Sequence, residues 1–216
     1  MSNHDNADIV SDTIQALSLV SDHGEQATRL ILGSNLTEFL MKLVTSADAT
    51  LQIPAVRILG NSLSGSDQQT QFLLDRGILP LLLDLTDHIK TGLRKEACWA
   101  ISNITAGSAA QVQQVISGGL IERLVAICHE DKPEVFSEAL WALCNCTENC
   151  NPEMFSQLVG KGLIEALFCR FDELPTRNLQ VMLIGARNIL EAGEKFYKDS
   201  NDENLFALEM LKNGYE

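Results

Sequence analysis

The repeating pattern of this chain is clearest in residues 95–103, which read Lys-Glu-Ala-Cys-Trp-Ala-Ile-Ser-Asn. If these residues form a helix, Glu96, Trp99 and Asn103 lie on one stripe, because they are three and four residues apart. A stripe kept in register along a chain indicates an internal repeat. Its counterparts are Glu138, Trp141 and Asn145, 42 residues later, and Arg57 and Asn61, which take the Trp and Asn places 42 residues earlier.

The composition indicates a globular, all-α protein. Of the 216 residues, 45% are hydrophobic, only five are proline and few are aromatic. The net charge of −13 argues against the nucleic-acid backbone as a partner and is compatible with a cationic one. The first residues carry no apolar segment of a signal peptide, and no apolar run approaches the ~18 residues of a membrane helix.

Each 42-residue period contains three amphipathic segments separated by turn signals. In the best-defined period we predict helices over 93–106, 109–117 and 120–129. A unit of this size cannot bury its own apolar face, so neighbouring units must stack, with the long helix of each lining a concave surface. We predict a disordered 1–9, stacked units near 10–46, 47–87, 88–130, 131–173 and 174–194, and an acidic loop with a partial last unit over 195–216.

Four phrases resemble the armadillo repeat and, more narrowly, the importin-α (karyopherin-α) family of nuclear import adaptors. They are residues 94–107, 68–71, 56–61 and 187–194. The resemblance runs from about Asp12 to about Gly214 and corresponds to the C-terminal half of such an adaptor. It implies an all-α, right-handed superhelical armadillo-repeat solenoid of about five three-helix units, without a cofactor or metal.

The resemblance also implies that the stripe residues bind nuclear localisation signals, as the minor site of this family does. Asn amides would hold the backbone of an extended peptide, since an amide both donates and accepts. Trp rings would take the stems and charges of Lys and Arg, and carboxylates would receive the cations. The peptide-binding residues implied are Arg57, Asn61, Ser64, Gly65, Thr70, Glu96, Trp99, Ser102, Asn103, Glu138, Trp141, Asn145 and Asn188.

Departures from the family pattern limit what the resemblance implies. Gln15 and Leu19 stand where a groove pair would lie, so we expect the groove to close there, and Ile184 replaces a ring residue near its other end. The repeats of the major site and the basic segment that recruits importin-β are not found in this sequence, so importin-β is an unlikely partner. The expected partners are Lys/Arg-rich signal peptides and an export receptor at the acidic C-terminal end, in the cytoplasm and nucleus.

Other interpretations of the same residues stay open. The two Trp residues could belong to the core, and the array could be a truncated scaffold for protein–protein interaction that dimerises through an uncapped end without transporting cargo. A zinc site at Cys144, Cys146, Cys150 and His129 is disfavoured, because the spacing lacks paired CxxC motifs. The sequence shows no catalytic triad and no phosphate-binding loop, so we do not predict an enzyme.

Overall fold

A computed structural model describes residues 7–215, and these residues are built from helices. They form two compact units, which divide between Ile104 and Thr105. Unit 1 comprises the described residues before this point and unit 2 those after it. Within residues 7–215, none of the helices combines the length and apolar character that crossing a bilayer requires.

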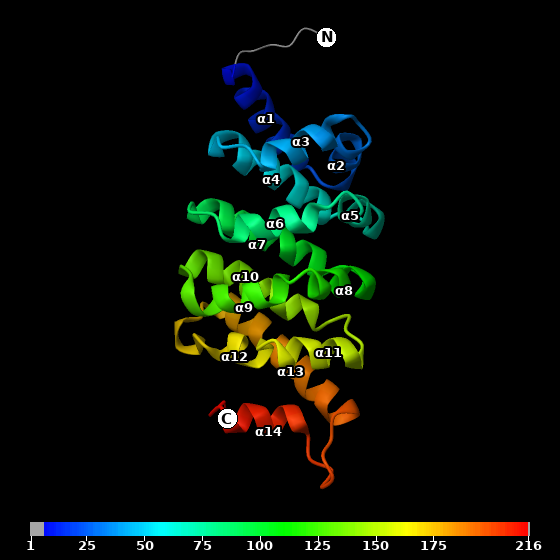
Figure 1. Ribbon diagram of the computed structural model, residues 1–216, viewed down its shortest axis with the longest axis vertical. Coiled ribbons are helices and arrows are strands. Elements are labelled where there is room, and N and C mark those ends of the chain that lie inside the picture. Colours follow the sequence, from blue (N-terminus) through cyan, green and yellow to red (C-terminus); the bar gives the residue numbers. More distant parts are fainter. Residues whose placement is uncertain (1–6, 216) are drawn as a thin grey trace. The chain divides into compact units, whose positions relative to one another are not determined.

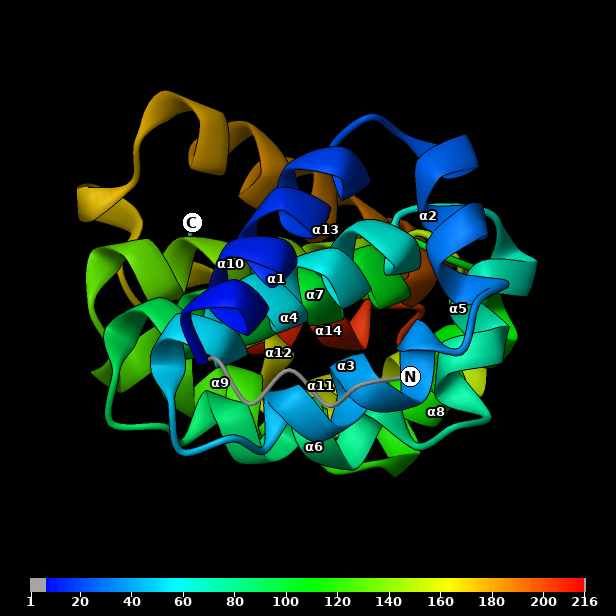
Figure 2. The ribbon, with the colours of Figure 1, turned by 90° about the horizontal axis from the view of Figure 1, so that it is seen from above.

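In unit 1 the helices form two layers with an edge between them. Helices α1, α4 and α7 make one layer, α3 and α6 make the other, and α2 and α5 lie along the edge (Figures 1 and 2). The helices are α1 (Ala7–Ser21), α2 (Glu25–Leu32), α3 (Leu36–Val44), α4 (Ala49–Leu63), α5 (Asp67–Leu74), α6 (Ile78–Thr86) and α7 (Thr91–Thr105), whose last residue belongs to unit 2.

Unit 2 repeats the arrangement, with α10 and α13 in one layer, α9 and α12 in the other, and α8 and α11 along the edge (Figures 1 and 2). Its last helix packs against α13. The helices are α8 (Ala109–Ser117), α9 (Leu120–Glu130), α10 (Pro133–Cys146), α11 (Pro152–Gly160), α12 (Leu163–Phe168), the 3-10 turn η1 (Phe171–Glu173), α13 (Thr176–Phe196) and α14 (Leu205–Lys212).

Short turns separate the second and third helix of each repeat, as the sequence predicts. Gly77, Gly119 and Gly162 adopt φ values of 79°, 77° and 92°, a left-handed conformation that other residues rarely adopt. The second helix often begins with a polar cap. In α5 and α8 the backbone N–H of Ser66 and Ser108 donates to a Gln side chain three residues on, at 3.0 Å.

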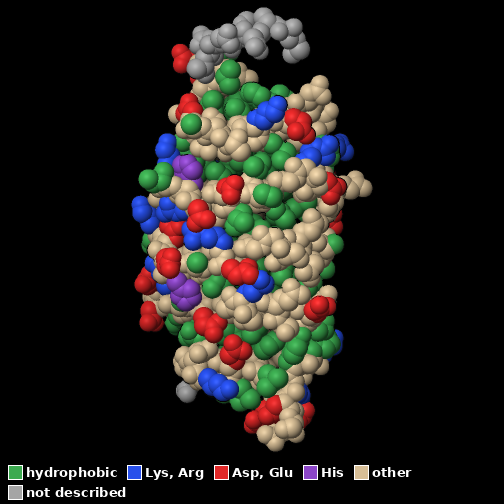
Figure 3. Space-filling view, viewed as in Figure 1, with side chains coloured by type: hydrophobic (Ala, Val, Ile, Leu, Met, Phe, Trp, Pro, Cys, Tyr) green, Lys and Arg blue, Asp and Glu red, His purple; other side chains and the backbone are tan. Residues whose placement is uncertain are grey.

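Apolar side chains fill the space between the layers of each unit. In unit 1, Leu40, Ile58 and Leu73 are fully buried, and in unit 2 the same holds for Leu124 and Leu158. Within each unit, acidic and basic side chains are interspersed on the face formed by its third helices (Figure 3). Because charges of both signs alternate there, this face of each unit would not favour a partner of one charge.

The helix boundaries differ from the predictions mainly at the two ends. Helix α1 begins at Ala7, so residues 7–9, which we predicted to be disordered, are helical, while residues 1–6 lie outside the described part. A glycine after an apolar helical segment predicts a helix end at Gly193, but α13 continues to Phe196. Gly193 is a packing residue, because a Cβ atom there would lie 2.0 Å from the side-chain oxygen of Asn204.

Candidate functional site

The Glu/Trp/Asn stripe of unit 1 lies beside the buried face of α7. Ala97, Cys98 and Ile101 are fully buried, whereas Trp99 and Asn103 are partly exposed. The apolar contacts of the helix are therefore made by other residues, which leaves part of the stripe accessible. Together with two residues of α4, the stripe forms what we call the unit 1 surface: Arg57, Asn61, Glu96, Trp99 and Asn103.

The Trp99 ring is positioned by a glycine on α4. A Cβ atom at Gly60 would lie 2.4 Å from Cζ3 of Trp99 and 3.0 Å from Cε3, which is closer than any packing contact. The indole therefore lies against the α4 backbone in the space that a side chain would fill. This contact fixes one edge of the ring and was not predicted from the sequence.

The two Asn amides of the unit 1 surface are partly engaged within the protein. The Nδ2 atom of Asn103 donates to the Gly60 carbonyl oxygen at 2.9 Å. Nδ2 of Asn61 donates to Ser21 Oγ at 2.8 Å and to Asp22 Oδ1 at 2.7 Å. These bonds orient the amides, and because an amide has two N–H groups and an acceptor oxygen, Asn103 retains capacity for a peptide backbone.

The carboxylate of this surface already faces a cation of the same chain. Arg57 Nη2 lies 3.7 Å from Glu96 Oε1, with the Arg57 side chain 52% exposed and that of Glu96 15% exposed. A long, half-exposed ion pair contributes only about 0–1 kcal/mol, so a peptide cation could exchange with Arg57. Burial raises the pKa of Glu96, and the nearby Arg57 and Lys95 oppose that shift.

The raised pKa of Glu96 leads to a pH-dependent prediction. The folded unit holds this proton more tightly than the unfolded chain, so its stability declines as the pH rises from the ordinary value of 4.5 through the folded pKa. A peptide cation favours the charged form. We therefore expect the affinity for a Lys/Arg peptide to rise over the same window, since Lys and Arg stay charged there.

Peptide titrations at several pH values between about 4.5 and 7 test this, in the range where carboxyl groups titrate. In Glu96→Gln the rise should be reduced, while the control Glu38→Gln, on an exposed carboxylate paired with Arg76, should leave it intact. An affinity that changes equally in both variants would contradict the role given to Glu96.

Four further predicted residues of unit 1 lie at or beneath the edge of the surface. Thr70 and Ser102 are buried, and their hydroxyls donate to the carbonyl oxygens of Leu63 and Trp99. They belong to the packing under the surface. Ser64 is exposed at the end of α4, where its hydroxyl donates to the Asn61 carbonyl. A Cβ at the fourth residue, Gly65, would meet the side-chain oxygen of Gln69 at 1.9 Å.

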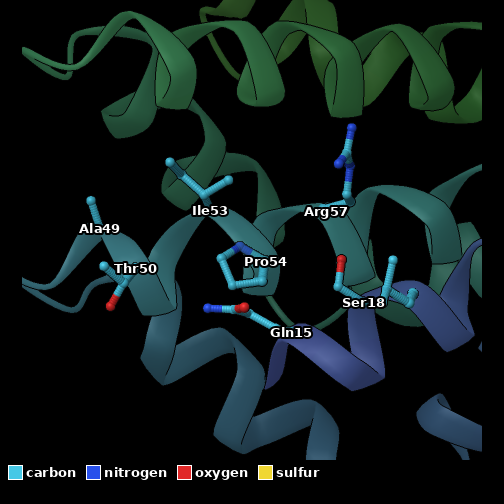
Figure 4. A pocket seen from close by; sticks show the side chains of 8 residues that line it. Gln15, Ser18, Ala49, Thr50, Ile53, Pro54 and Arg57 are labelled. Carbon is cyan, nitrogen blue, oxygen red and sulfur yellow. The ribbon is translucent and has the colours of Figure 1, made fainter. Parts of the chain in front are cut away.

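A hollow of about 430 Å³ adjoins the unit 1 surface between α1 and α4. Figure 4 shows Gln15 and Ser18 coming from α1 and the other labelled residues from α4, with Arg57 pointing away from α1. The groove was predicted to close near Gln15 and Leu19, and both residues line this hollow. Its other lining is mostly apolar: Ala49, Thr50, Ile53 and Pro54, with Arg57 at the border with the stripe.

In unit 2 the corresponding surface, which we call the unit 2 surface, comprises Glu138, Trp141 and Asn145 of α10 and Asn188 of α13. All four are partly exposed. Nδ2 of Asn188 donates to Thr147 Oγ1 at 3.0 Å. Ile184, at the place of a ring residue, is 42% exposed and so presents an aliphatic side chain instead.

Two residues at the start of α13 hold Trp141, and neither was predicted from the sequence. The indole Nε1–H donates to Asn178 Oδ1 at 3.3 Å, and Asn178 Nδ2 donates to Ser137 Oγ at 2.7 Å. The Arg177 guanidinium carbon lies 4.9 Å from the Trp141 ring centroid. Arg177 lies outside the 42-residue stripe, so the repeat gave no signal for it.

Unit 2 also has a hollow, of about 340 Å³, which lies beside Asn188. Glu148 and Glu191 contribute carboxylates to its lining, and Phe155 and Phe196 contribute rings. Carboxylates next to aromatic faces are the chemistry that binds Lys and Arg side chains. Lys195 also lines the hollow, with its Nζ atom 4.7 Å from the Phe196 ring centroid, so a cation of the chain already contacts one of these rings.

The cysteines of α10 and of the turn that follows it are surrounded by protein, which keeps their thiols protonated. Cys144 and Cys146 are buried, and burial raises the pKa of both thiols. Burial also raises the pKa of Cys150 to about 12, and its Sγ donates to the Cys146 carbonyl at 2.7 Å. Thiols held in the protonated form are poor metal ligands and nucleophiles. Among residues 7–215 no three His, Cys, Asp or Glu side chains are grouped so as to hold a metal ion.

Comparisons with known proteins identify the repeat. Residues 66–106 and 108–148 match the family described as Armadillo/beta-catenin-like repeat. The designed armadillo repeat protein YIII(Dq)4CqI superposes with a TM-score of 0.82 at 25% identity, covering 97% of this chain and 88% of that one. Computationally designed armadillo repeat proteins for modular peptide recognition give 0.81 at 25% identity, covering 98% and 89%.

A third solved structure shows the same fold with a ligand. It is the designed armadillo repeat protein YIII(Dq.V1)4CPAF in complex with peptide (KR)4, with a TM-score of 0.81, 24% identity, and coverage of 99% of this chain and 96% of that one. A comparison with curated proteins found no match. The predicted fold class, an all-α armadillo-repeat solenoid, is confirmed.

Proposed function

We propose that this chain, an armadillo-repeat scaffold, binds Lys/Arg-rich peptides on its unit 1 and unit 2 surfaces. The observation that carries the proposal is the recurrence of a partly exposed Glu/Trp/Asn stripe in both units. Each stripe offers a carboxylate for a cation, a ring face for its aliphatic stem and an amide for the peptide backbone. The net charge of −13 would further attract a cationic peptide.

The solved structures support this proposal through their fold and their ligand. A scaffold of the same fold carries a bound peptide of alternating Lys and Arg, (KR)4. An extended peptide is an apt partner for a repeat array, because each repeat presents the same groups at a regular spacing. Binding by such an array needs no catalytic group, and we propose a protein–protein interaction module and not an enzyme.

A finer proposal follows from the resemblance to importin-α, namely that the peptides are nuclear localisation signals of cargo proteins. The protein would then act in nuclear import and be found in the cytoplasm and nucleus, with an export receptor as a further partner at the C-terminal end. The residues that support this are the family-like phrase 94–107 and the stripe itself.

The alternative function is a scaffold that binds partner proteins without transporting cargo. The exposed apolar side chains at the start of unit 1 favour it, since Leu19 is 67% and Leu30 76% exposed. Exposed apolar side chains are suited to contact with another protein surface. In this version the protein would bind its partner through these side chains, and the unit 1 and unit 2 surfaces would not bind basic peptides.

Titration of a fluorescent Lys/Arg-rich peptide separates the two functions. We expect saturable binding that weakens with salt and is lost when every Lys and Arg of the peptide is replaced by Gln. Trp99→Ala with Trp141→Ala should lower the affinity by about a hundredfold, since Trp side chains dominate binding energies where they are buried by a ligand.

Trp99→Phe with Trp141→Phe, which keeps two ring faces, should retain part of the affinity. Circular dichroism must show equal helix content in all variants. Affinity unchanged by the double Ala variant would refute the assignment of the surfaces, and absence of binding by the unmodified protein would favour the cargo-free scaffold.

A further inference from the structure

The Trp141 ring of unit 2 is covered by a cation from its own chain. Arg177 is the second residue of α13, is exposed, and places its guanidinium carbon 4.9 Å from the indole centroid. Cations within ~6 Å of a ring centroid are attracted by its π face. Arg177 thus takes a position that a Lys or Arg of a bound peptide would otherwise occupy.

This contact is supported by the residue that follows it. Asn178 is 5% exposed and accepts the Trp141 Nε1–H at 3.3 Å, while its own amide donates to Ser137 at 2.7 Å. The edge of the indole is therefore held by the buried Asn178 amide, which makes two side-chain hydrogen bonds. Removing the Arg177 side chain should therefore uncover the ring face without releasing the ring.

The Trp99 ring of unit 1 has a different environment. It lies against the Gly60 backbone, and none of the cation–ring pairs formed among residues 7–215 includes Trp99. Arg57, the cation of that surface, is paired with Glu96 instead. The two tryptophans have the same place in the repeat, but within residues 7–215 a cation–ring pair is formed at Trp141 and not at Trp99.

We infer that Arg177 is an intramolecular competitor that a basic peptide must displace from Trp141. The inference rests on the proposed function, since it concerns peptide binding at the same surface. Arg177 both occupies the ring face and adds a positive charge near an incoming cation. It would therefore make Trp141 the weaker of the two ring sites and select for peptides with enough positive charge to displace it.

Arg177→Gln tests the competition, because it removes the charge and keeps most of the side-chain length. We expect the affinity for (KR)4 to rise about three- to tenfold, the range of a partly exposed cation–ring contact. The rise should vanish when Trp141 is Ala. Lys212→Gln on α14 is the matched control, since it makes the same change in net charge without touching the ring. An equal rise in the control, or none in Arg177→Gln, overturns the inference.

A measurement without peptide keeps this test separate from the proposed function. The chain has two tryptophans, so in Trp99→Phe the fluorescence comes from Trp141 alone. Adding Arg177→Ala should raise the quenching of Trp141 by acrylamide by about half or more, because the side chain over one ring face is removed. Unchanged quenching would show that Arg177 does not cover the ring and overturns the inference. Increased quenching with no (KR)4 binding by any variant would instead refute the proposed function, and the competition with it.

Discussion

Gly60→Ala is expected to destabilise unit 1 and to weaken its binding of basic peptides. In an ordinary helix interior the same change stabilises by about 1 kcal/mol, because glycine is a poor helix former. Here the new methyl group would lie 2.4 Å from Cζ3 of Trp99, so the ring or the helix must move. Overpacking of this kind costs about 1–3 kcal/mol, which outweighs the gain in helix propensity.

Urea unfolding and peptide titration together measure this effect. A ring displaced from Gly60 should also disturb the Asn103 bond to the Gly60 carbonyl, so the affinity should fall about tenfold for the loss of one such contact. Gly92→Ala on α7 is the control, because its Cβ would meet only Ile53 at 3.9 Å. It should leave the unit unchanged or slightly more stable. If both variants behave alike, the packing of Trp99 on Gly60 is not what positions the ring.

Much of the fold follows from local signals in the sequence. Helix α8 begins and ends at the predicted residues, because Ser108 caps its start and Gly118 follows its end. The left-handed Gly77 and Gly119 show why such signals are reliable, since few other residues adopt that conformation. Because the same pattern recurs every 42 residues, the sequence also indicates which helices belong to the same repeat.

The surfaces were predictable only in part. The stripe residues were found because they recur, but Gly60 does not, as Ser102 and Cys144 take its place in the next two repeats. Nor does the period include Arg177, whose importance comes from a contact across helices. A repeat reveals what all units share, whereas the features that distinguish Trp99 from Trp141 belong to single repeats.

Gly193 shows the opposite case, a local signal that tertiary structure overrides. It lies between Ala192 and Glu194 near the expected end of a helix, which is the usual place for a terminating glycine. In the structure the helix passes through it, and the missing side chain makes room for Asn204. The partner lies 11 positions further on, at the N-cap of α14, and this contact between two helices could not be identified from the sequence alone.

Asn204 joins the last two helices, and its removal should have a large local effect. Its Nδ2 donates to the Leu190 carbonyl at 2.8 Å, and its Oδ1 accepts from the N–H groups of Phe206 and Ala207 at 3.0 and 3.1 Å. Asn204→Ala removes a helix cap and a link to α13, together about 2 kcal/mol. We expect amide exchange in α14 to accelerate about thirtyfold. The control is Asn201→Ala in the same loop, whose amide contacts only Asp199.

Substitutions at Gly193 and Asn204 should have coupled effects on the docking of α14, because the two residues are in contact. The three atoms nearest to a methyl group at residue 193 would all belong to the Asn204 side chain. Gly193→Ala alone should therefore weaken the docking of α14 by a cost similar to that of Asn204→Ala, as measured by amide exchange. In the Asn204→Ala background the same change should cost little, or stabilise α13 by up to about 1 kcal/mol through helix propensity. Costs that simply add would mean that the two residues act independently, and that Gly193 has some role in α13 other than admitting Asn204.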